Sequence, residues 1–527
     1  MDENRSRWPR LGWALGGHWK NCGSLRPANS VSDCGCGMAT PMKFMGIGLV
    51  LVLAIGIVAW GALVPGKQLL APKSSKSRET AKSKEVEELP DLSGVLEVTS
   101  NPKVILTLPE WAVPFRPQYY RVSSSDIQVV RSTSVLPEPL GERQLSLTII
   151  PTGVGYSHLH VTLRDGVHTK RFGIHYAASA SERAGGYWHL GASDGSAALA
   201  IDSGWMVVGD DEDQTLRLYA RDQNGPAAAK FDMNPFLGLT DLHHNGKPKE
   251  IDIEAAVRQG NQLYWVGSES HDRAGQPALN RGRLFRTDLV GTGKASELQF
   301  IGRYDYLLQD LIHWDASNAH RRGTNFFGLT ASAAPGVPSK EPSGEGFVIE
   351  GVCRAVGDPQ TAWLAFRAPL VPPDARWKAL IVPVTNFFAL AASGDPEGSA
   401  RFGAPIQLDL GGRGVRDVMC DGTNVLIVAG PPGRMSPSLP HDFRMFTWDG
   451  NPFHPPELRL ADLTGLHPEA IVELPPAPWT ENSTVQLVSD CGTMEYYGDG
   501  VLAKDLHSAG FKKFRSDVVK LGPVVTR

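Results

Sequence analysis

The chain has 527 residues, which is long for one domain, and 42% of them are hydrophobic while 20% are charged. This composition is ordinary for a globular protein that buries at least two cores. The formal net charge of -4 gives no basic surface for nucleic acid, and the sequence contains no nucleic-acid-binding motif. Nucleic acid is therefore excluded as a partner.

An unbroken, uncharged run of 21 residues occupies positions 44–64. In a helix that rises about 1.5 Å per residue, this length matches the hydrocarbon core of a bilayer, so the run predicts one transmembrane helix. A cleaved signal peptide is the alternative, because Lys43 precedes the run and small residues lie near its end. Residues 1–43 are expected to be a disordered tail, in which Met38 or Met42 would each begin a conventional export signal.

Two signals about the orientation of this helix disagree. More Lys and Arg residues closely follow the run than precede it, and this bias favours a cytoplasmic C-terminal part. The β-rich architecture predicted downstream favours export instead. We expect a single-pass protein of a bacterial inner membrane whose C-terminal domains lie in the periplasm. Residues 65–92 are rich in Lys, Ser, Glu and Pro, and they predict a flexible stalk.

Alternating apolar residues after the stalk indicate β-strands. Residues 155–176 predict a hairpin with an Asp-Gly turn, and their order of strands and turns resembles the C-terminal half of bacterial immunoglobulin-like and cadherin-like modules. The resemblance implies a small immunoglobulin-like β-sandwich at 93–180. His158 and His160 share one face of the first hairpin strand. Exposure to solvent is the ordinary interpretation of this pair, and metal ligation is the alternative.

From Tyr187 onward one pattern recurs, in which a small or acidic residue opens an apolar strand, a polar turn follows, and a second apolar strand ends in Gly or Ala. The matched opening residues of the five copies are Ser196, Glu254, Glu350, Asp417 and Glu469. Their spacings of 58, 96, 67 and 52 residues are long for propeller blades of about 40–50 residues, but they suit blades with inserted loops. The sequence therefore predicts an all-β fold with a C-terminal β-propeller of five to seven blades at 187–525.

The longest interval between copies contains a helix-like segment at 304–314, followed by a stretch rich in Pro, Gly and Ser. An inserted lid or a sixth blade is expected there. Cys353, Cys420 and Cys491 lie in or near the repeats, and they allow at most one disulfide.

The acidic opening residues predict a ring at the centre of the propeller. Because the first strand of each blade lines the central channel, Glu254, Glu350, Asp417 and Glu469 would converge near one mouth. Such carboxylates raise one another's pKa unless a cation intervenes, and calcium, which prefers oxygen ligands, is the candidate, with Glu254 and Glu350 as its ligands. Two other interpretations stay open: each carboxylate caps its own blade by accepting backbone N–H groups, or the ring performs acid/base catalysis.

Further polar residues follow the second strands of the copies. Arg273, Arg367 and His271 are candidates for binding a polar or anionic ligand together with the ring, and solvated loops are the alternative. The sequence around Ser193 has the form G-x-S-x-G. A nucleophile elbow needs a helix after the serine, whereas a strand is predicted here, so Ser193 is not expected to be a nucleophile.

The segment 191–522 resembles an uncharacterised bacterial domain family of unknown function with propeller-like sequence. The matching stretches are Ile253-Glu254-Ala255 with 263–268 and Arg273, and Ile349-Glu350-Gly351 with 363–369. A distant likeness to phytase-like and esterase-like propellers does not place their calcium ligands on residues of this chain. The resemblance implies a fold and leaves the activity open. We expect a membrane-anchored module that binds a small ligand, a glycan or a protein, the alternative being a calcium-dependent phosphoester or ester hydrolase.

Overall fold

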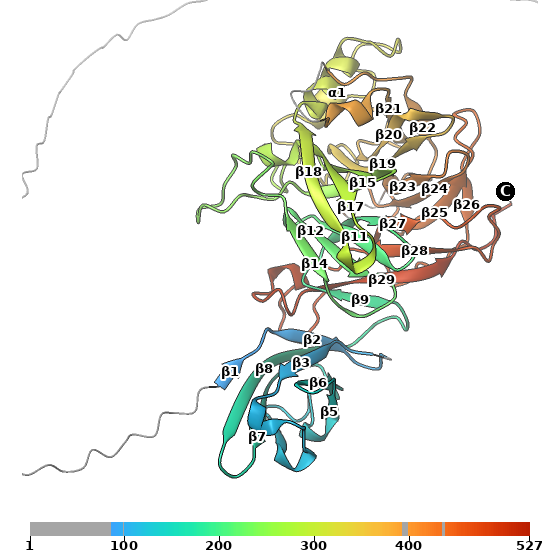
Figure 1. Cartoon of the computed structure of the whole chain (residues 1–527). Helices are drawn as coiled ribbons and strands as arrows, with labels where there is room; N and C mark the ends of the chain where they lie inside the picture. The colour runs from blue at the N-terminus through green and yellow to red at the C-terminus, as the bar shows by residue number, and fades with distance from the viewer. Residues whose placement is uncertain (1–85, 99, 393–398, 435–437, 527) are drawn as a thin grey trace, which may run out of the picture. The chain divides into compact units, whose positions relative to one another are not determined.

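The computed structural model describes residues 86–526 except 99, 393–398 and 435–437 (Figure 1). The expected tail and the expected transmembrane helix at 44–64 lie outside these residues. Within the described part, no helix is long and apolar enough to cross a bilayer. All of the described residues fall within one compact unit, 80–527.

Two β-sheets occupy the first part of the described chain. The first sheet contains β1 (Val86–Glu88), β2 (Leu92–Val95), β4 (Tyr120–Ser124), β7 (Gly155–Arg164) and β8 (Thr169–Ser179), and the second contains β3 (Lys103–Thr107), β5 (Val135–Pro139) and β6 (Gln144–Ile149). The predicted hairpin is confirmed, since β7 pairs antiparallel with β8 around an Asp165 carboxylate that accepts the N–H groups of Val167 and His168. The predicted stalk ends earlier than expected, because β1 and β2 both pair with β8.

Alternation along these strands explains why they form a two-sheet core. On β6 and β7, apolar side chains recur at every second position and are fully buried in one cluster: Leu145, Leu147, Ile149, Leu159, Val161 and Leu163. A period of two places these residues on one face of each strand. The opposite face of β7 carries polar side chains, among them His158 and His160.

Five sheets with four antiparallel strands each follow. They are β10 (Gly195–Ala200), β11 (Trp205–Asp210), β12 (Thr215–Ala220) and β14 (Ala229–Asp232); β15 (Ile253–Gln259), β16 (Gln262–Gly267), β17 (Leu284–Val290) and β18 (Glu297–Tyr304); β19 (Val348–Ala355), β20 (Asp358–Ala368), β21 (Ala379–Val384) and β22 (Ile406–Leu408); β23 (Gly414–Cys420), β24 (Val425–Gly430), β25 (Arg444–Trp448) and β26 (Glu457–Arg459); and β27 (Pro468–Glu473), β28 (Thr484–Ser489), β29 (Lys513–Lys520) and β9 (Tyr187–Leu190). A short strand, β13 (Gly225–Pro226), pairs parallel beside β9.

The first strands of the five sheets lie next to one another in a cycle. Strands β10, β15, β19, β23 and β27 contact each other in this order, and β27 contacts β10. The last sheet joins both ends of this part, because β9 pairs with β29 and Leu190 lies opposite Lys513. The arrangement is propeller-like, and the five predicted repeats begin at the five first strands.

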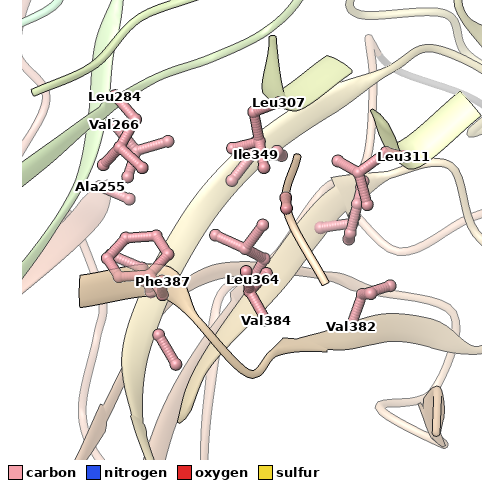
Figure 2. Close-up of a cluster of buried hydrophobic side chains, with 14 of the residues drawn as sticks. Ala255, Val266, Leu284, Leu307, Leu311, Ile349, Leu364, Val382, Val384 and Phe387 are labelled. Carbon is pink, nitrogen blue, oxygen red and sulfur yellow. The ribbon is translucent and has the colours of Figure 1, made fainter. Parts of the chain in front are cut away.

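The interval between β18 and β19 contains helices. They are α1 (Leu307–Ala316) and α2 (Leu329–Ser332), and no additional sheet occurs among the described residues of this interval. Figure 2 shows Leu307 of α1 beside Ile349 of β19, and Leu311 and Phe387 of α3 (Phe387–Leu390) belong to the same buried cluster. Burying one such side chain contributes about 1.5–3 kcal/mol, so the insertion extends the core.

Short 3-10 helices connect several strands: η1 (Glu110–Ala112), η2 (Pro117–Tyr119), η3 (Ser132–Ser134), η4 (Leu279–Arg281), η5 (Gly293–Ala295) and η6 (Ala503–Asp505). The three cysteines near the repeats are buried, and each is a free thiol. The single disulfide that the sequence allowed is absent from these described residues.

Candidate ion site at the inner strands

In each of the five sheets of the propeller-like part, a β-bulge interrupts the first strand at an equivalent position. In each first strand, the pairing with the second strand skips one residue. The skipped residues are Ser196, Glu254, Glu350, Arg416 and Glu469. A bulge re-aims the side chain of the extra residue away from the regular pleat. The five sheets therefore present five equivalent buried side chains at their inner strands.

The prediction that Asp417 belongs to this ring is wrong by one residue. Val415 and Asp417 are both paired with β24, and Arg416 between them is the residue that bulges. Asp417 instead accepts the backbone N–H of Val418 at 2.7 Å and that of Ile471 at 2.6 Å. Burial raises the pKa of Asp417 to about 7, and the backbone N–H groups oppose this shift. Asp417 thus links β23 to β27 as a capping carboxylate.

Arg416 changes the charge of the ring, because it pairs with two of the expected carboxylates. Its Nε lies 3.0 Å from Glu350 Oε2, and its guanidinium also pairs with Glu469. Arg367 contacts the other oxygen of Glu350 at 2.7 Å and donates to the carbonyls of Pro431 and Pro432. Glu350 therefore forms ion pairs with two arginines, although its Oε2 makes no hydrogen bond within the described residues.

Glu254 differs from the other ring carboxylates. Its side chain is 3% exposed, and it has no hydrogen-bond or ion-pair partner among the described residues. Glu254, Asp211 and Asp252 each offer an oxygen, and the three oxygens lie within 4.8 Å of one another. Burial, followed by the charges of Glu350 and Asp252, raises the pKa of Glu254 well above its usual value. The charges of Lys340 and Arg416 oppose this shift in part.

The loop after β11 supplies the second unpaired carboxylate of this group. Asp211 Oδ1 is buried and has no hydrogen-bond partner in the described structure. Burial, and then the charge of Asp194, raise the pKa of Asp211. Asp194 and Glu212 form a second group of neighbouring carboxylates with Asp211. Burial, Asp490 and Asp210 raise the pKa of Asp194 to about 8. The acidic region therefore extends from β15 to the start of β10.

A small cavity of about 40 Å³ connects these residues to the surface. A buried water needs about 10–15 Å³, so the cavity has room for an ion with one or two waters. The cavity wall contains Asp211, Asp252 and Glu254, and it also contains Arg273, Arg281 and Lys340. Arg281 holds Asp252 at 2.9 Å, which leaves the second carboxylate oxygen of Asp252 for another partner.

Of the other residues singled out in the sequence, Arg273 lies at the cavity, whereas His271 and Ser193 do not line it. Arg273 is exposed, and the Nδ1 of His271 lies 3.3 Å from the carbonyl of Val337. Ser193 is buried, and its hydroxyl donates to Asp194 at 2.5 Å. Strand β10 follows Ser193, as predicted, so the helix that a nucleophile elbow requires is absent there.

Sequence reasoning missed Asp211, Asp252 and Arg281 as partners of Glu254. Asp211 opens an acidic run after the second strand of the first copy, and Asp252 lies two positions before Glu254, but neither position repeats in the other copies. The prediction relied on positions that recur in every copy. Asp211, Asp252 and Arg281 do not recur, so the repeat pattern did not point to them.

Comparisons with known proteins agree with the resemblance noted in the sequence. Residues 194–283 and 330–478 match the family described as a protein of unknown function, DUF3616. These segments contain the inner strands β15, β19, β23 and β27, and thus Glu254, Glu350 and Arg416. No curated protein matches the chain.

Two solved structures from Bacteroides thetaiotaomicron VPI-5482 are similar in part. One, provisionally assigned as a phosphatase, is 9% identical and has a TM-score of 0.25, with 82% of this chain and 88% of that chain covered. The other, a quinoprotein alcohol dehydrogenase-like protein, is 11% identical and has a TM-score of 0.23, with 83% and 97% covered. At these TM-scores neither similarity bears on activity.

Proposed function

We propose that this chain is a membrane-tethered, extracytoplasmic five-bladed propeller that binds a divalent cation, and through it an anionic group of a glycan or protein partner. The observation that carries the proposal is the unpaired, buried Glu254 facing a small cavity together with Asp211 and Asp252. A hard cation such as calcium takes several oxygen ligands, and it would relieve the repulsion between these carboxylates.

The same cavity favours recognition of an anion next to the cation. Arg273 and Lys340 belong to its wall, and Arg273 is exposed. A carboxylate or phosphate oxygen of a ligand would complete the coordination of the cation and pair with these side chains. The cavity of about 40 Å³ holds an ion but has no room for a whole substrate, which favours binding over hydrolysis.

Calcium is expected to bind the purified full-length chain with one equivalent that depends on Glu254. Glu254→Gln and Asp211→Asn remove charge without changing shape, and each is expected to weaken calcium binding at least about 10-fold in calorimetry. Glu297→Gln, an exposed carboxylate on β18, is the matched control and is expected to bind like the parent chain. Equal calcium affinity in Glu254→Gln and the parent chain would refute the proposal.

A phosphatase assay distinguishes the hydrolase alternative from the binding role. Calcium-dependent release of phosphate from a phosphomonoester by the parent chain, lost in Glu254→Gln, would replace the binding role by a catalytic one. Calcium binding without turnover is expected, because Glu350 and Glu469 are engaged with Arg416 and Ser193 lies in a loop before a strand.

The membrane anchor predicts a defined topology. The uncharged run at 44–64 is long enough to span the bilayer once, and we propose that residues 86–526 lie outside the cytoplasm. Protease added to intact spheroplasts is expected to degrade the C-terminal part, while a cytoplasmic marker survives. Protection of the C-terminal part until detergent is added would show the opposite orientation.

A further inference from the structure

Three histidines gather on the polar face of the first sheet, remote in sequence from the inner-strand site. His158 on β7 lies directly opposite His175 on β8. Their rings are stacked, with centroids 4.1 Å apart and an angle of 15° between the planes, and the ring of His160 lies 4.1 Å from that of His158. Two strands therefore bring three imidazoles together.

A carboxylate from a third strand reaches this group. Glu88 is on β1, which runs parallel beside β8, and it is paired with Gly173. A Cβ atom at position 173 would lie 2.1 Å from Glu88 Oε2, so any larger residue there would displace the Glu88 carboxylate from its place above β8. In that space, Glu88 Oε2 lies 3.4 Å from His158 Nε2 and 3.9 Å from His175 Nε2.

The imidazole of His158 has an unused ligand atom. His158 Nε2 is buried and makes no hydrogen bond within the described part of the chain. A solvent-facing histidine, the ordinary interpretation of the sequence, would place this nitrogen in water. Here it faces Glu88 and His175, and one atom from each of the three residues lies within 4.8 Å of the others.

We propose that Glu88, His158 and His175 form a zinc site. Zinc bonds of about 2.0–2.1 Å in a tetrahedral arrangement place ligand atoms about 3.3 Å apart, so the carboxylate and His158 already have the required separation. His175 Nε2 needs to approach Glu88 Oε2 by about half an ångström. Two imidazoles and one carboxylate suit zinc better than calcium, which prefers oxygen ligands alone. Water or His160 would complete the coordination.

The ion would connect three strands that the chain brings together from distant positions. β1 has three residues and pairs along one edge only, at β8. An ion bound by Glu88, His158 and His175 would link β1 to β7 and β8. It would thereby stabilise the start of the folded region, which follows the proposed membrane anchor. The site is independent of the proposed calcium site, because no residue is common to both.

The test uses the purified full-length chain with zinc, and with cobalt as a spectroscopic probe. The parent chain is expected to bind one more zinc equivalent in calorimetry than His158→Gln/His175→Gln, and to show a visible absorption band of tetrahedral cobalt that this double variant lacks. His507→Gln, an exposed histidine in the propeller-like part, is the control and is expected to keep both signals. Cysteines of the N-terminal tail are common to all variants and contribute equally.

Gly173→Ala provides a second variant, which changes none of the three proposed ligand residues. Its methyl group is expected to displace the Glu88 carboxylate and to weaken zinc binding at least about 10-fold. A double variant that melts at the same temperature as the parent chain in chelator is folded, so its loss of zinc supports the site. Equal zinc stoichiometry and affinity in the parent chain and the double variant would overturn the proposal.

Discussion

Replacing Arg416 by Met is expected to lower the free energy of unfolding by about 3–5 kcal/mol, because the change leaves buried carboxylates without their cation. Glu350 and Glu469 are 1% and 5% exposed, so water does not solvate them in place of the guanidinium. Chemical denaturation of Arg416→Met and the parent chain measures the difference.

Two further variants isolate the charge effect. Arg416→Met/Glu469→Gln is expected to regain most of the lost stability, since Glu350 keeps Arg367 at 2.7 Å and the charge of Glu469 is removed together with that of Arg416. Arg444→Met is the control, because Arg444 pairs with Asp442 at the surface, where such pairs contribute about 0–1 kcal/mol. If Arg416→Met unfolds within 1 kcal/mol of Arg444→Met, the charge assignment of the ring is wrong.

The buried Lys513 is expected to make a contribution to stability that rises with pH between about 7 and 10. This ammonium is 0% exposed and lies 4.9–5.7 Å from the ring centroids of Trp188, Tyr496 and Tyr497. It donates to the carbonyl of Gly94 at 3.1 Å, and it has no carboxylate partner in the described structure. Burial lowers the pKa of Lys513 from 10.5 to about 7.

The sign of the pH dependence that Lys513 contributes follows from proton linkage. Between pH 7 and 10.5 the unfolded chain holds a proton on Lys513 that the folded chain has released, so raising the pH favours the folded state. The contribution is about 1.4 kcal/mol per pH unit within this window. Buried thiols such as Cys491, whose pKa burial raises to about 12, act in the opposite direction above pH 9.

Lys513→Met separates these effects, because it removes only the ammonium. Urea denaturation at pH 7, 8 and 9 is expected to show a slope against pH that is smaller by about 1.4 kcal/mol per unit than in the parent chain. Lys520→Met, an exposed lysine on the same strand, is expected to keep the parent slope. Identical slopes for Lys513→Met and the parent chain would mean that Lys513 stays charged in the folded state.

The repeat pattern predicted the five inner strands because strand alternation and turn residues are local signals. It placed Glu254, Glu350 and Glu469 at equivalent positions, which the bulges confirm. In the fourth copy, Arg416 and Asp417 are adjacent, and the sequence favoured the acid because the other copies are acidic. A shift of one residue in a strand reverses the face of a side chain, and only the pairing with β24 decides it.

The sequence also predicted a ring of carboxylates without protein partners, whereas in the structure most of these carboxylates have partners. Glu350 and Glu469 pair with Arg416, which the repeat pattern did not predict, and Asp417 accepts backbone N–H groups, as the capping interpretation expected. Among the four predicted ring residues, only Glu254 is a carboxylate without an arginine or backbone partner in the described structure. Its partners Asp211 and Asp252 come from loops beside the strands, and such contacts depend on how the sheets are placed in space, which no periodicity reveals.

Strand β9 has a consequence for biosynthesis. It is made before the five inner strands, but it pairs with β29, which is made last, and Leu190 lies opposite Lys513. During synthesis, therefore, the edge of β9 that pairs with β29 stays unpaired until β29 has been made. A chain truncated before β29 would leave β9 and β28 with open edges, and such edges pair readily with other chains. Formation of β29 therefore closes the edges of β9 and β28 at the same time.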